Sequence, residues 1–155
     1  MIYWLINGKL GGSSIPTRDD LEYWKTIGIS AIVSLVEPHE FAWGADIKAM
    51  KDMGFDVLWI PVRDMTAPTI EQLEKIVKWI DERIKQGKKV VVHCYGGYGR
   101  SGTALAAYLI YSKGLSADEA IRAVRRVRRG AIMTRDQELI LFVFEKKVKD
   151  KGKNE

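Results

Sequence analysis

Short runs of apolar residues recur along the chain, and they predict the strands of a buried sheet. Four stretches have this pattern: Ile2 to Ile6, Ile29 to Val36, Phe55 to Ile60 and Lys89 to Cys94. The last three are apolar at nearly every position, as in parallel strands that are covered on both faces. We therefore expect a central, mostly parallel sheet of about four to five strands.

The segments between and after the predicted strands have apolar residues at helical spacing. Five helices are expected, with these approximate bounds: Thr17 to Ile27, Thr69 to Gln86, Ser101 to Lys113, Ser116 to Arg128 and Arg135 to Val148. Thr69 followed by Gln72 matches the capping box that begins many helices, and Ser116 followed by Glu119 is a second match. Residues 38–53 are ambiguous, and only 46–53 favour a further short helix.

The alternation of strands and helices describes one α/β domain with helices on both faces of the sheet. A chain of 155 residues, 46% of them apolar, has enough material for one core. We expect a single domain over residues 1–148. The charged segment Lys149 to Glu155 is expected to be a frayed tail.

Cysteine content and hydropathy indicate the compartment. Cys94 is the single cysteine, which excludes an intrachain disulfide and a four-cysteine zinc site and suits a reducing environment. No run approaches the roughly eighteen apolar residues of a transmembrane helix, and the N-terminus lacks the basic and then apolar pattern of a signal peptide. We expect a cytoplasmic protein.

The formal charge of +5 indicates an anionic partner. The charge alone does not distinguish nucleic acid, anionic lipid and phosphorylated substrates. Arginines are concentrated in one predicted helix, where they share a face: Arg122, Arg125, Arg126 and Arg129. This basic stripe is either a solvated helix face or a docking surface for acidic phosphopeptides, RNA or membrane phosphoinositides.

The sequence HCYGGYGRSG at 93–102 leads from a buried strand into a helix and predicts an anion site. Its three glycines, Gly96, Gly97 and Gly99, allow positive φ angles that turn backbone N–H groups inward, and the helix N-terminus adds positive potential. Arg100 can grip two phosphate oxygens with its planar guanidinium. The expected phosphate-binding residues are Cys94, Tyr95, Gly96, Gly97, Tyr98, Gly99 and Arg100.

Cys94 begins this loop, so its sulfur would lie under a bound phosphate, where the same positive field favours the thiolate nucleophile. A lone cysteine after a strand is usually a small core residue, and the neighbouring loop residues argue against that interpretation. A Walker-type nucleotide loop would require a lysine where Arg100 stands. A rhodanese-type sulfur transferase and a phosphate-binding module without turnover are the remaining alternatives.

His93, Cys94, Gly97, Arg100 and Ser101 match the signature His-Cys-x-x-Gly-x-x-Arg-Ser, so the chain resembles the protein tyrosine and dual-specificity phosphatases. The loop is particularly similar to that of the compact archaeal members. The segment RGAIMTRDQ at 129–137 is similar to a second family segment, except that Arg129 stands where proline is usual. The resemblance implies a protein tyrosine phosphatase-like fold.

The resemblance also implies a role for each residue of the site. Cys94 would be the nucleophile, Arg100 the phosphate clamp, and Asp64, thirty positions before Cys94, the general acid and then base. Ser101 would assist the departure of the sulfur, and Gln137 would orient the attacking water. His93 is expected to orient loop backbone groups, and His39 to be a surface residue. No metal or cofactor is required.

The expected activity is hydrolysis of phosphotyrosine in proteins, with phosphoserine and phosphothreonine as further substrates, through a phosphocysteine intermediate. Phosphorylated proteins are the expected partners of a monomeric enzyme. Phosphatase activity on RNA 5′ ends or phosphoinositides is the alternative, as is the non-catalytic phosphate-binding module.

Overall fold

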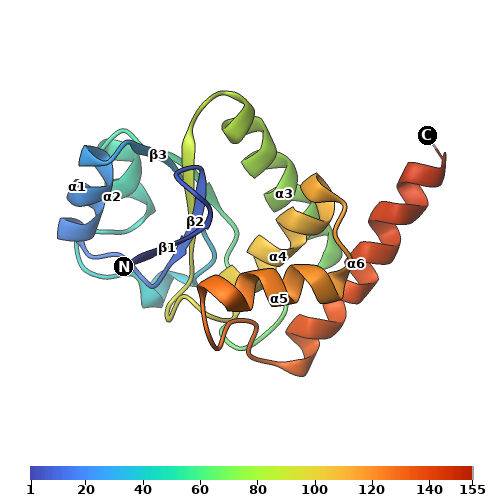
Figure 1. Cartoon of the computed structure of the whole chain (residues 1–155). Helices are drawn as coiled ribbons and strands as arrows, with labels where there is room; N and C mark the ends of the chain where they lie inside the picture. The colour runs from blue at the N-terminus through green and yellow to red at the C-terminus, as the bar shows by residue number, and fades with distance from the viewer. Residues whose placement is uncertain (155) are drawn as a thin grey trace.

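A five-stranded sheet divides the molecule into two layers of helices (Figure 1). The computed structural model describes residues 1–154. Its strands are β1 (Ile2–Ile6), β2 (Leu10–Ser13), β3 (Ile29–Ser34), β4 (Asp56–Trp59) and β5 (Lys89–His93), in the spatial order β1-β2-β5-β3-β4. Only β1 and β2 pair antiparallel. The predicted mostly parallel sheet is therefore confirmed.

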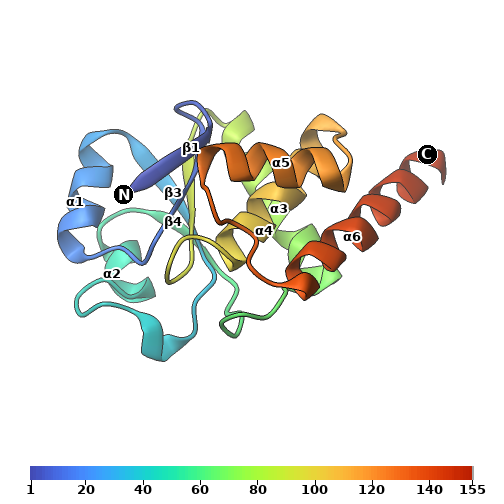
Figure 2. The same ribbon diagram turned by 60° about the horizontal axis from the view of Figure 1, so that its bottom comes forward.

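Helices cover both faces of the sheet, as Figures 1 and 2 show from two directions. The helices are α1 (Arg18–Thr26), α2 (Ile47–Asp52), α3 (Ile70–Lys85), α4 (Arg100–Lys113), α5 (Ala117–Val127) and α6 (Arg135–Asn154), with a 3₁₀ turn at Pro38–Glu40. One apolar core joins α1 and α2 to the sheet, and a second and larger one lies under α3 to α6.

The predicted helix starts are confirmed at the level of individual hydrogen bonds. Thr69 Oγ1 accepts from the Gln72 N–H at 3.1 Å, and Gln72 Oε1 accepts from the Thr69 N–H at 2.9 Å. Ser116 and Glu119 make the same reciprocal pair at the start of α5. Each box satisfies N–H groups that the first turn of a helix leaves without partners.

Strand β2 was not predicted, because its sequence LGGS reads as a turn. Glycine is required there by a neighbour in β1: a Cβ on Gly12 would lie 2.2 Å from Cζ of Tyr3. The Tyr3 ring thus packs directly on the backbone of β2. Glycine weakens a strand in isolation, and here it admits a large side chain from the next strand.

The tail expected to fray from Lys149 is helical through Asn154, so that prediction is wrong over the described residues. Ion pairs hold the last turns. Lys149 pairs with Glu145 one turn back, and Lys147 and Lys151 contact Glu74 of α3 at 2.7 and 3.2 Å. Contacts to α3 therefore lengthen α6 beyond what its apolar periodicity indicates.

The position of β5 and α4 decides where the site lies. β5 is the central strand of the sheet, flanked by β2 and β3, and every residue of α4 from Arg100 to Ile110 is buried. The loop between them emerges at the carboxyl end of the parallel strands, where α/β proteins bind ligands. In the part of the chain described here, no helix has both the length and the apolar character needed to cross a membrane.

Candidate active site

Cys94 lies at the base of the loop that joins β5 to α4, and its side chain is almost completely buried. Its Sγ is 3.2 Å from Oγ of Ser101 in the first turn of α4. The Cys94 N–H points to the carbonyl of Ser13 in β2 at 3.4 Å. The fold therefore holds the sulfur beneath the N-terminus of a buried helix, where the positive end of the helix dipole favours an anion.

The three loop glycines, which the sequence analysis expected to allow positive φ angles, serve different purposes. Only Gly97 has a positive φ, at +79°. A Cβ on Gly97 would also lie 2.8 Å from the Ser14 nitrogen, and one on Gly99 would lie 2.9 Å from Nε2 of Gln137. Gly97 thus supplies a turn and a close backbone contact, whereas Gly99 supplies room for a side chain.

Arg100 is fully buried and is held in place by Glu40, a residue that the sequence analysis did not select. Its NH1 and NH2 donate to the two carboxylate oxygens of Glu40 at 2.9 and 2.7 Å, and NH1 also donates to the Val62 carbonyl at 2.8 Å. Hydrogen bonds from Arg100 hold the pKa of Glu40 below its ordinary value. Nε of Arg100 is buried without a partner and remains able to donate to a ligand.

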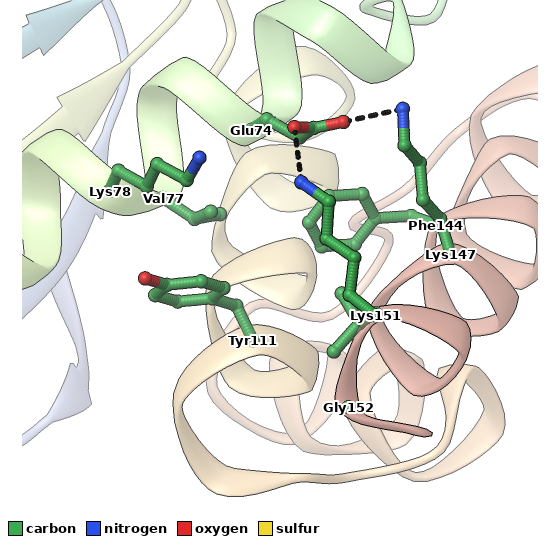
Figure 3. Close-up of a pocket in the computed structure, with 9 residues that line it drawn as sticks. Glu74, Val77, Lys78, Tyr111, Phe144, Lys147, Lys151 and Gly152 are labelled. Atoms are coloured by element: carbon green, nitrogen blue, oxygen red, sulfur yellow. Dashed lines mark hydrogen bonds and ion pairs between the residues drawn. The ribbon is translucent and has the colours of Figure 1, made fainter. Parts of the chain in front are cut away.

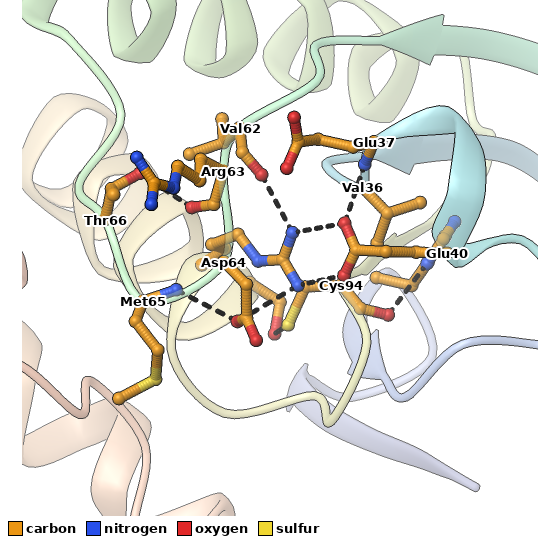
Figure 4. Close-up of polar contacts among 12 residues, drawn as sticks. Val36, Glu37, Glu40, Val62, Arg63, Asp64, Met65, Thr66 and Cys94 are labelled. Carbon is orange, nitrogen blue, oxygen red and sulfur yellow. Dashed lines mark hydrogen bonds and ion pairs between the residues drawn. The ribbon is translucent and has the colours of Figure 1, made fainter.

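Asp64 stands at the mouth of the site on a four-residue turn. The Thr66 N–H closes this turn onto the Arg63 carbonyl at 3.1 Å. Asp64 Oδ1 accepts from the Met65 N–H at 2.9 Å and lies 3.2 Å from NH2 of Arg100, while its side chain is 65% exposed. Figure 4 shows Asp64, Glu40 and Cys94 gathered at this point. The structure therefore brings the predicted acid next to the predicted clamp.

His93 is completely buried, and its position fits an orienting role better than proton transfer. Its Nδ1 lies 3.1 Å from the carbonyl of Cys94, and its ring packs edge-on against Phe41. Burial lowers the pKa of His93 to about 4. The imidazole is therefore neutral at physiological pH, and its contact with the Cys94 carbonyl fixes the start of the loop.

Tyr3, which sequence analysis missed, reaches the loop from the other end of the chain. Its hydroxyl donates to the Gly97 carbonyl at 2.9 Å and lies 3.3 Å from Oγ of Ser101. Burial raises the pKa of Tyr3 to about 12, so the hydroxyl keeps its proton. Tyr3, Ser101 and Cys94 thus form a chain of neighbouring polar atoms beneath the loop.

Arg128 grips the outer side of the same loop. Its guanidinium donates to the carbonyls of Gly96 at 2.9 Å and Gly97 at 3.3 Å. It also lies over the rings of Tyr98, at 3.9 Å, and Tyr3, at 5.3 Å. These bonds hold two loop carbonyls at Arg128, an arrangement compatible with the expected nest of inward N–H groups. No sequence signal distinguished Arg128 from the other arginines near it.

Gln137 is buried and connects three parts of the site. Its Oε1 accepts from the N–H groups of Met133 and Thr134, and its Nε2 donates to the Thr66 carbonyl at 3.1 Å. It also fills the space that Gly99 leaves. The amide thereby joins the turn that carries Asp64 to the phosphate loop, and one Nε2–H remains for a ligand.

An open groove of about 480 Å³ leads to Asp64 and Glu40. The other residues that line it are Ile15, His39, Phe41, Ala42 and Tyr95. A second cavity, of about 370 Å³, lies between α3 and α6, where Glu74 is paired with Lys147 and Lys151 (Figure 3). It contains none of the predicted site residues.

Donor atoms of Glu37, His39 and Glu40 lie within 4.8 Å of one another, so together they could reach one metal ion. Both carboxylate oxygens of Glu40 are, however, bonded to Arg100. A metal ion would have to displace that ion pair, and this arrangement does not favour a metal centre. His39 is exposed, as expected.

The predicted basic stripe is divided by the fold. The Arg125 guanidinium donates to the carbonyls of Ala131 and Ile132, both at 2.9 Å, in the segment that follows α5. Arg122, Arg126 and Arg129 are exposed. All four arginines are therefore exposed, and Arg125 is in addition a structural brace for the segment that leads into α6.

A deep cysteine, a buried arginine and an exposed aspartate around a helix N-terminus define a phosphate-binding α/β protein of the cysteine phosphatase class. The sequence model of the family described as "Polymorphic toxin system, DSP-PTPase phosphatase" matches residues 8–114. The chain therefore belongs to the DSP-PTPase family, the dual-specificity and protein tyrosine phosphatases.

Relatives named as phosphatases agree with this assignment. Tyrosine-protein phosphatase CDC14 of Candida albicans is 34% identical over 81% of this chain, and phosphatidylglycerophosphate phosphatase PTPMT2 of Arabidopsis thaliana is 30% identical over 86%. The chain spans 22% and 58% of the lengths of these two proteins. The fold closely matches the crystal structure of Tk-PTP in its active form, with a TM-score of 0.88 and 40% identity, over 94% of this chain and 96% of that one.

Proposed function

We propose that this chain is a phosphatase that hydrolyses phosphotyrosine in proteins, and also phosphoserine and phosphothreonine, through a phosphocysteine intermediate. The observation that carries the proposal is the position of Cys94 Sγ, buried under the N-terminus of α4 and 3.2 Å from Ser101 Oγ. Relatives and structural neighbours named as tyrosine phosphatases support it.

In the first step, the Cys94 thiolate attacks phosphorus and the bond to the ester oxygen breaks. The loop N–H groups and the unpaired Nε of Arg100 hold the phosphate oxygens. Phosphate competes with Asp64 for Arg100, which releases the carboxyl group to protonate the leaving oxygen. The products of this step are the free alcohol or phenol and phosphocysteine.

In the second step, water attacks the phosphocysteine and releases inorganic phosphate. Asp64, now ionised, accepts the proton of the water, and the free Nε2–H of Gln137 positions the water oxygen. Ser101 donates a hydrogen bond to the departing sulfur, and Tyr3 keeps Ser101 in place. Backbone N–H groups and side chains of the chain itself bind the phosphate and transfer the protons in this scheme, so it calls for no metal.

We further propose that the protein acts as a monomer in the cytoplasm. A free cysteine at the centre of the site is compatible with a reducing compartment. All the residues of the two-step scheme come from one copy of the chain, so turnover requires no second copy.

The test compares wild type with Cys94→Ser on p-nitrophenyl phosphate in buffer containing EDTA. We expect wild-type turnover, none with Cys94→Ser, and retained binding of phosphate by the variant, because the loop and Arg100 remain. Near-normal turnover by Cys94→Ser would remove Cys94 from the mechanism. A panel of phosphopeptides, inositol phosphates and 5′-phosphorylated RNA then ranks substrates, and faster turnover of either non-peptide class would contradict the protein assignment.

A further inference from the structure

Four large apolar side chains stand in solvent on the loops that build the site. Trp43, Met65, Tyr95 and Met133 are 97%, 51%, 55% and 53% exposed. Side chains of this kind are usually buried, and single exposed ones need no explanation. Here, however, each belongs to a different loop, and each loop also contributes a neighbour of the phosphate cradle.

The exposure of Trp43 is imposed by the backbone that carries it. The Ala45 N–H closes a turn onto the Ala42 carbonyl at 3.1 Å, with Trp43 and Gly44 at its tip. Gly44 has φ of +74°, and its carbonyl accepts from the Arg18 guanidinium at 3.3 Å. Trp43 is therefore held outward by a braced turn.

Met65 is presented in the same manner beside the proposed acid. It shares the tip of the closed turn with Asp64 and has φ of +65°, a conformation that non-glycine residues rarely adopt. In Figure 4 its side chain points away from Cys94. Backbone strain of this kind persists only where the surrounding contacts enforce it, and it is concentrated at functional sites.

Tyr95 and Met133 complete the set. The Tyr95 carbonyl accepts from the Ile15 N–H at 2.8 Å, and the Met133 N–H donates to Gln137 at 2.9 Å. The residue before Met133, Ile132, has φ of +61° and is, with Met65, one of the two non-glycine residues of the described chain in this region. Both strained residues therefore lie on loops that carry one of the four exposed side chains.

Contacts already described place the loops that carry these side chains beside the cradle. Ala42, next to Trp43, lines the groove together with Asp64 and Tyr95. Gln137 bonds both the Met133 N–H and the Thr66 carbonyl, so the Met133 loop adjoins the turn that carries Met65. We call Trp43, Met65, Tyr95 and Met133 the apolar collar.

We propose that the apolar collar binds the residues that flank the phosphorylated residue of a protein substrate, so that the enzyme prefers phosphosites with apolar neighbours in an extended segment. This inference rests on the proposed function. A phosphate ester in the cradle is covalently attached to the rest of its substrate, which therefore leaves the cradle past the loops that carry the collar. Burial of apolar flanking residues against rigidly held Trp, Tyr and Met side chains favours such segments at a small ordering cost.

The charges beside the collar favour a peptide over an anionic membrane. Membrane-surface sites combine apolar side chains with an excess of Lys and Arg. The loops here carry both signs: exposed Arg63 adjoins Asp64, and exposed Arg135 adjoins Asp136. A surface of mixed charge gives no net attraction to anionic lipid.

The experiment compares two phosphotyrosine peptides that differ only in their flanking residues, one with Leu, Met and Phe and one with Ser and Gly. Enzymes are wild type, Trp43→Ser, Met133→Ser and the matched control Tyr23→Ser, whose side chain on α1 is 61% exposed. We expect wild type to favour the apolar peptide. Each collar variant should lose about 5- to 30-fold in kcat/KM on that peptide and less than about twofold on the polar one.

Turnover of p-nitrophenyl phosphate, which has no flanking residues, should be unchanged in all three variants. Equal kcat/KM for the two peptides in wild type, or equal losses in Tyr23→Ser and the collar variants, would overturn the proposal. So would a loss by Trp43→Ser of binding to phosphatidylglycerol vesicles without a change in peptide preference. If wild type fails to hydrolyse p-nitrophenyl phosphate, the proposed function falls, and peptide affinities of Cys94→Ser with and without Trp43→Ser still decide the collar.

Discussion

Asp64 illustrates how one side chain can be held at a site and still be free to act. Its carboxylate contacts Arg100 but remains largely in solvent. We expect Asp64→Asn to lower kcat on phenyl phosphate by roughly 10²- to 10⁴-fold, because the phenolate must then leave without a proton. The loss should be much smaller with a more acidic leaving group such as p-nitrophenol. A loss that is equal for both esters, measured by steady-state kinetics, would show that Asp64 is not the acid.

His93 connects the site to the pH dependence of stability. Its pKa of about 4 in the folded protein lies below the value of about 6.5 in an unfolded chain, so between these values only the unfolded state takes up the proton. The free energy of unfolding should therefore fall as the pH falls, by about 2 kcal/mol from pH 7.5 to pH 5.

Urea denaturation at several pH values measures this dependence. His93→Gln should flatten the curve above pH 5, whatever its effect on overall stability, and His39→Gln should not. The same slope in His93→Gln as in wild type would assign the proton uptake to another group.

At the scale of elements, the phosphate loop is fixed from outside by the end of α5. Arg128→Ala removes two hydrogen bonds to loop carbonyls and a contact with Tyr98. We expect vanadate inhibition to weaken by about tenfold, since loop N–H groups would no longer be held toward the anion. Arg128→Lys should restore only part of the vanadate inhibition, because a lysine lacks the planar guanidinium that donates to both loop carbonyls.

The control for this prediction is Arg126→Ala, one of the exposed arginines of the same helix. Its inhibition constant for vanadate should equal that of wild type. If Arg126→Ala and Arg128→Ala raised the inhibition constant for vanadate equally, the loss of one positive charge, and not the loss of hydrogen bonds to the loop, would explain the weaker inhibition.

The elements that sequence predicts best here are those defined by local signals. Capping boxes at Thr69 and Ser116 mark the starts of α3 and α5 because donor and acceptor are three residues apart. Cys94, Arg100 and Ser101 could be selected because they lie on one loop and one helix turn. β2 was not predicted because the reason for its glycine at position 12 is the Tyr3 ring of β1, a contact that the local sequence does not show.

The residues missed at the site share a physical reason. Glu40 contacts Arg100 across 60 positions of sequence, and Tyr3 contacts Ser101 across 98. Nothing in the local pattern around Glu40, Tyr3 or Arg128 sets them apart from surface residues of the same types. Only the folded sheet brings them to the phosphate loop.

At the scale of the whole molecule, the first strand is a structural support of the site. Gly12→Ala should force the Tyr3 ring away from β2 and its hydroxyl away from Gly97, because the added Cβ would meet the ring at 2.2 Å. We expect a loss of about 1–3 kcal/mol in the free energy of unfolding, the usual cost of overpacking, together with lower kcat.

A second substitution separates packing from function in this prediction. In a Tyr3→Ser background, Gly12→Ala should cost little further stability, because the ring is gone, and kcat should stay low, because no tyrosine hydroxyl reaches the loop. Tyr3→Phe alone should lower kcat with little change in the urea midpoint. Recovery of full kcat by the double variant would show that Tyr3 only fills space.

The contact between Tyr3 and the phosphate loop has a consequence for the order in which the protein is made. The ribosome makes Tyr3 of β1 long before its partners, because Gly97 and Ser101 follow it by 94 and 98 residues and Arg128 comes later still. Contacts so distant in sequence close late in folding. A nascent chain that stops before Arg128 therefore contains Cys94 but lacks a residue that holds the phosphate loop. We expect catalytic activity only after α5 and the start of α6 have been made.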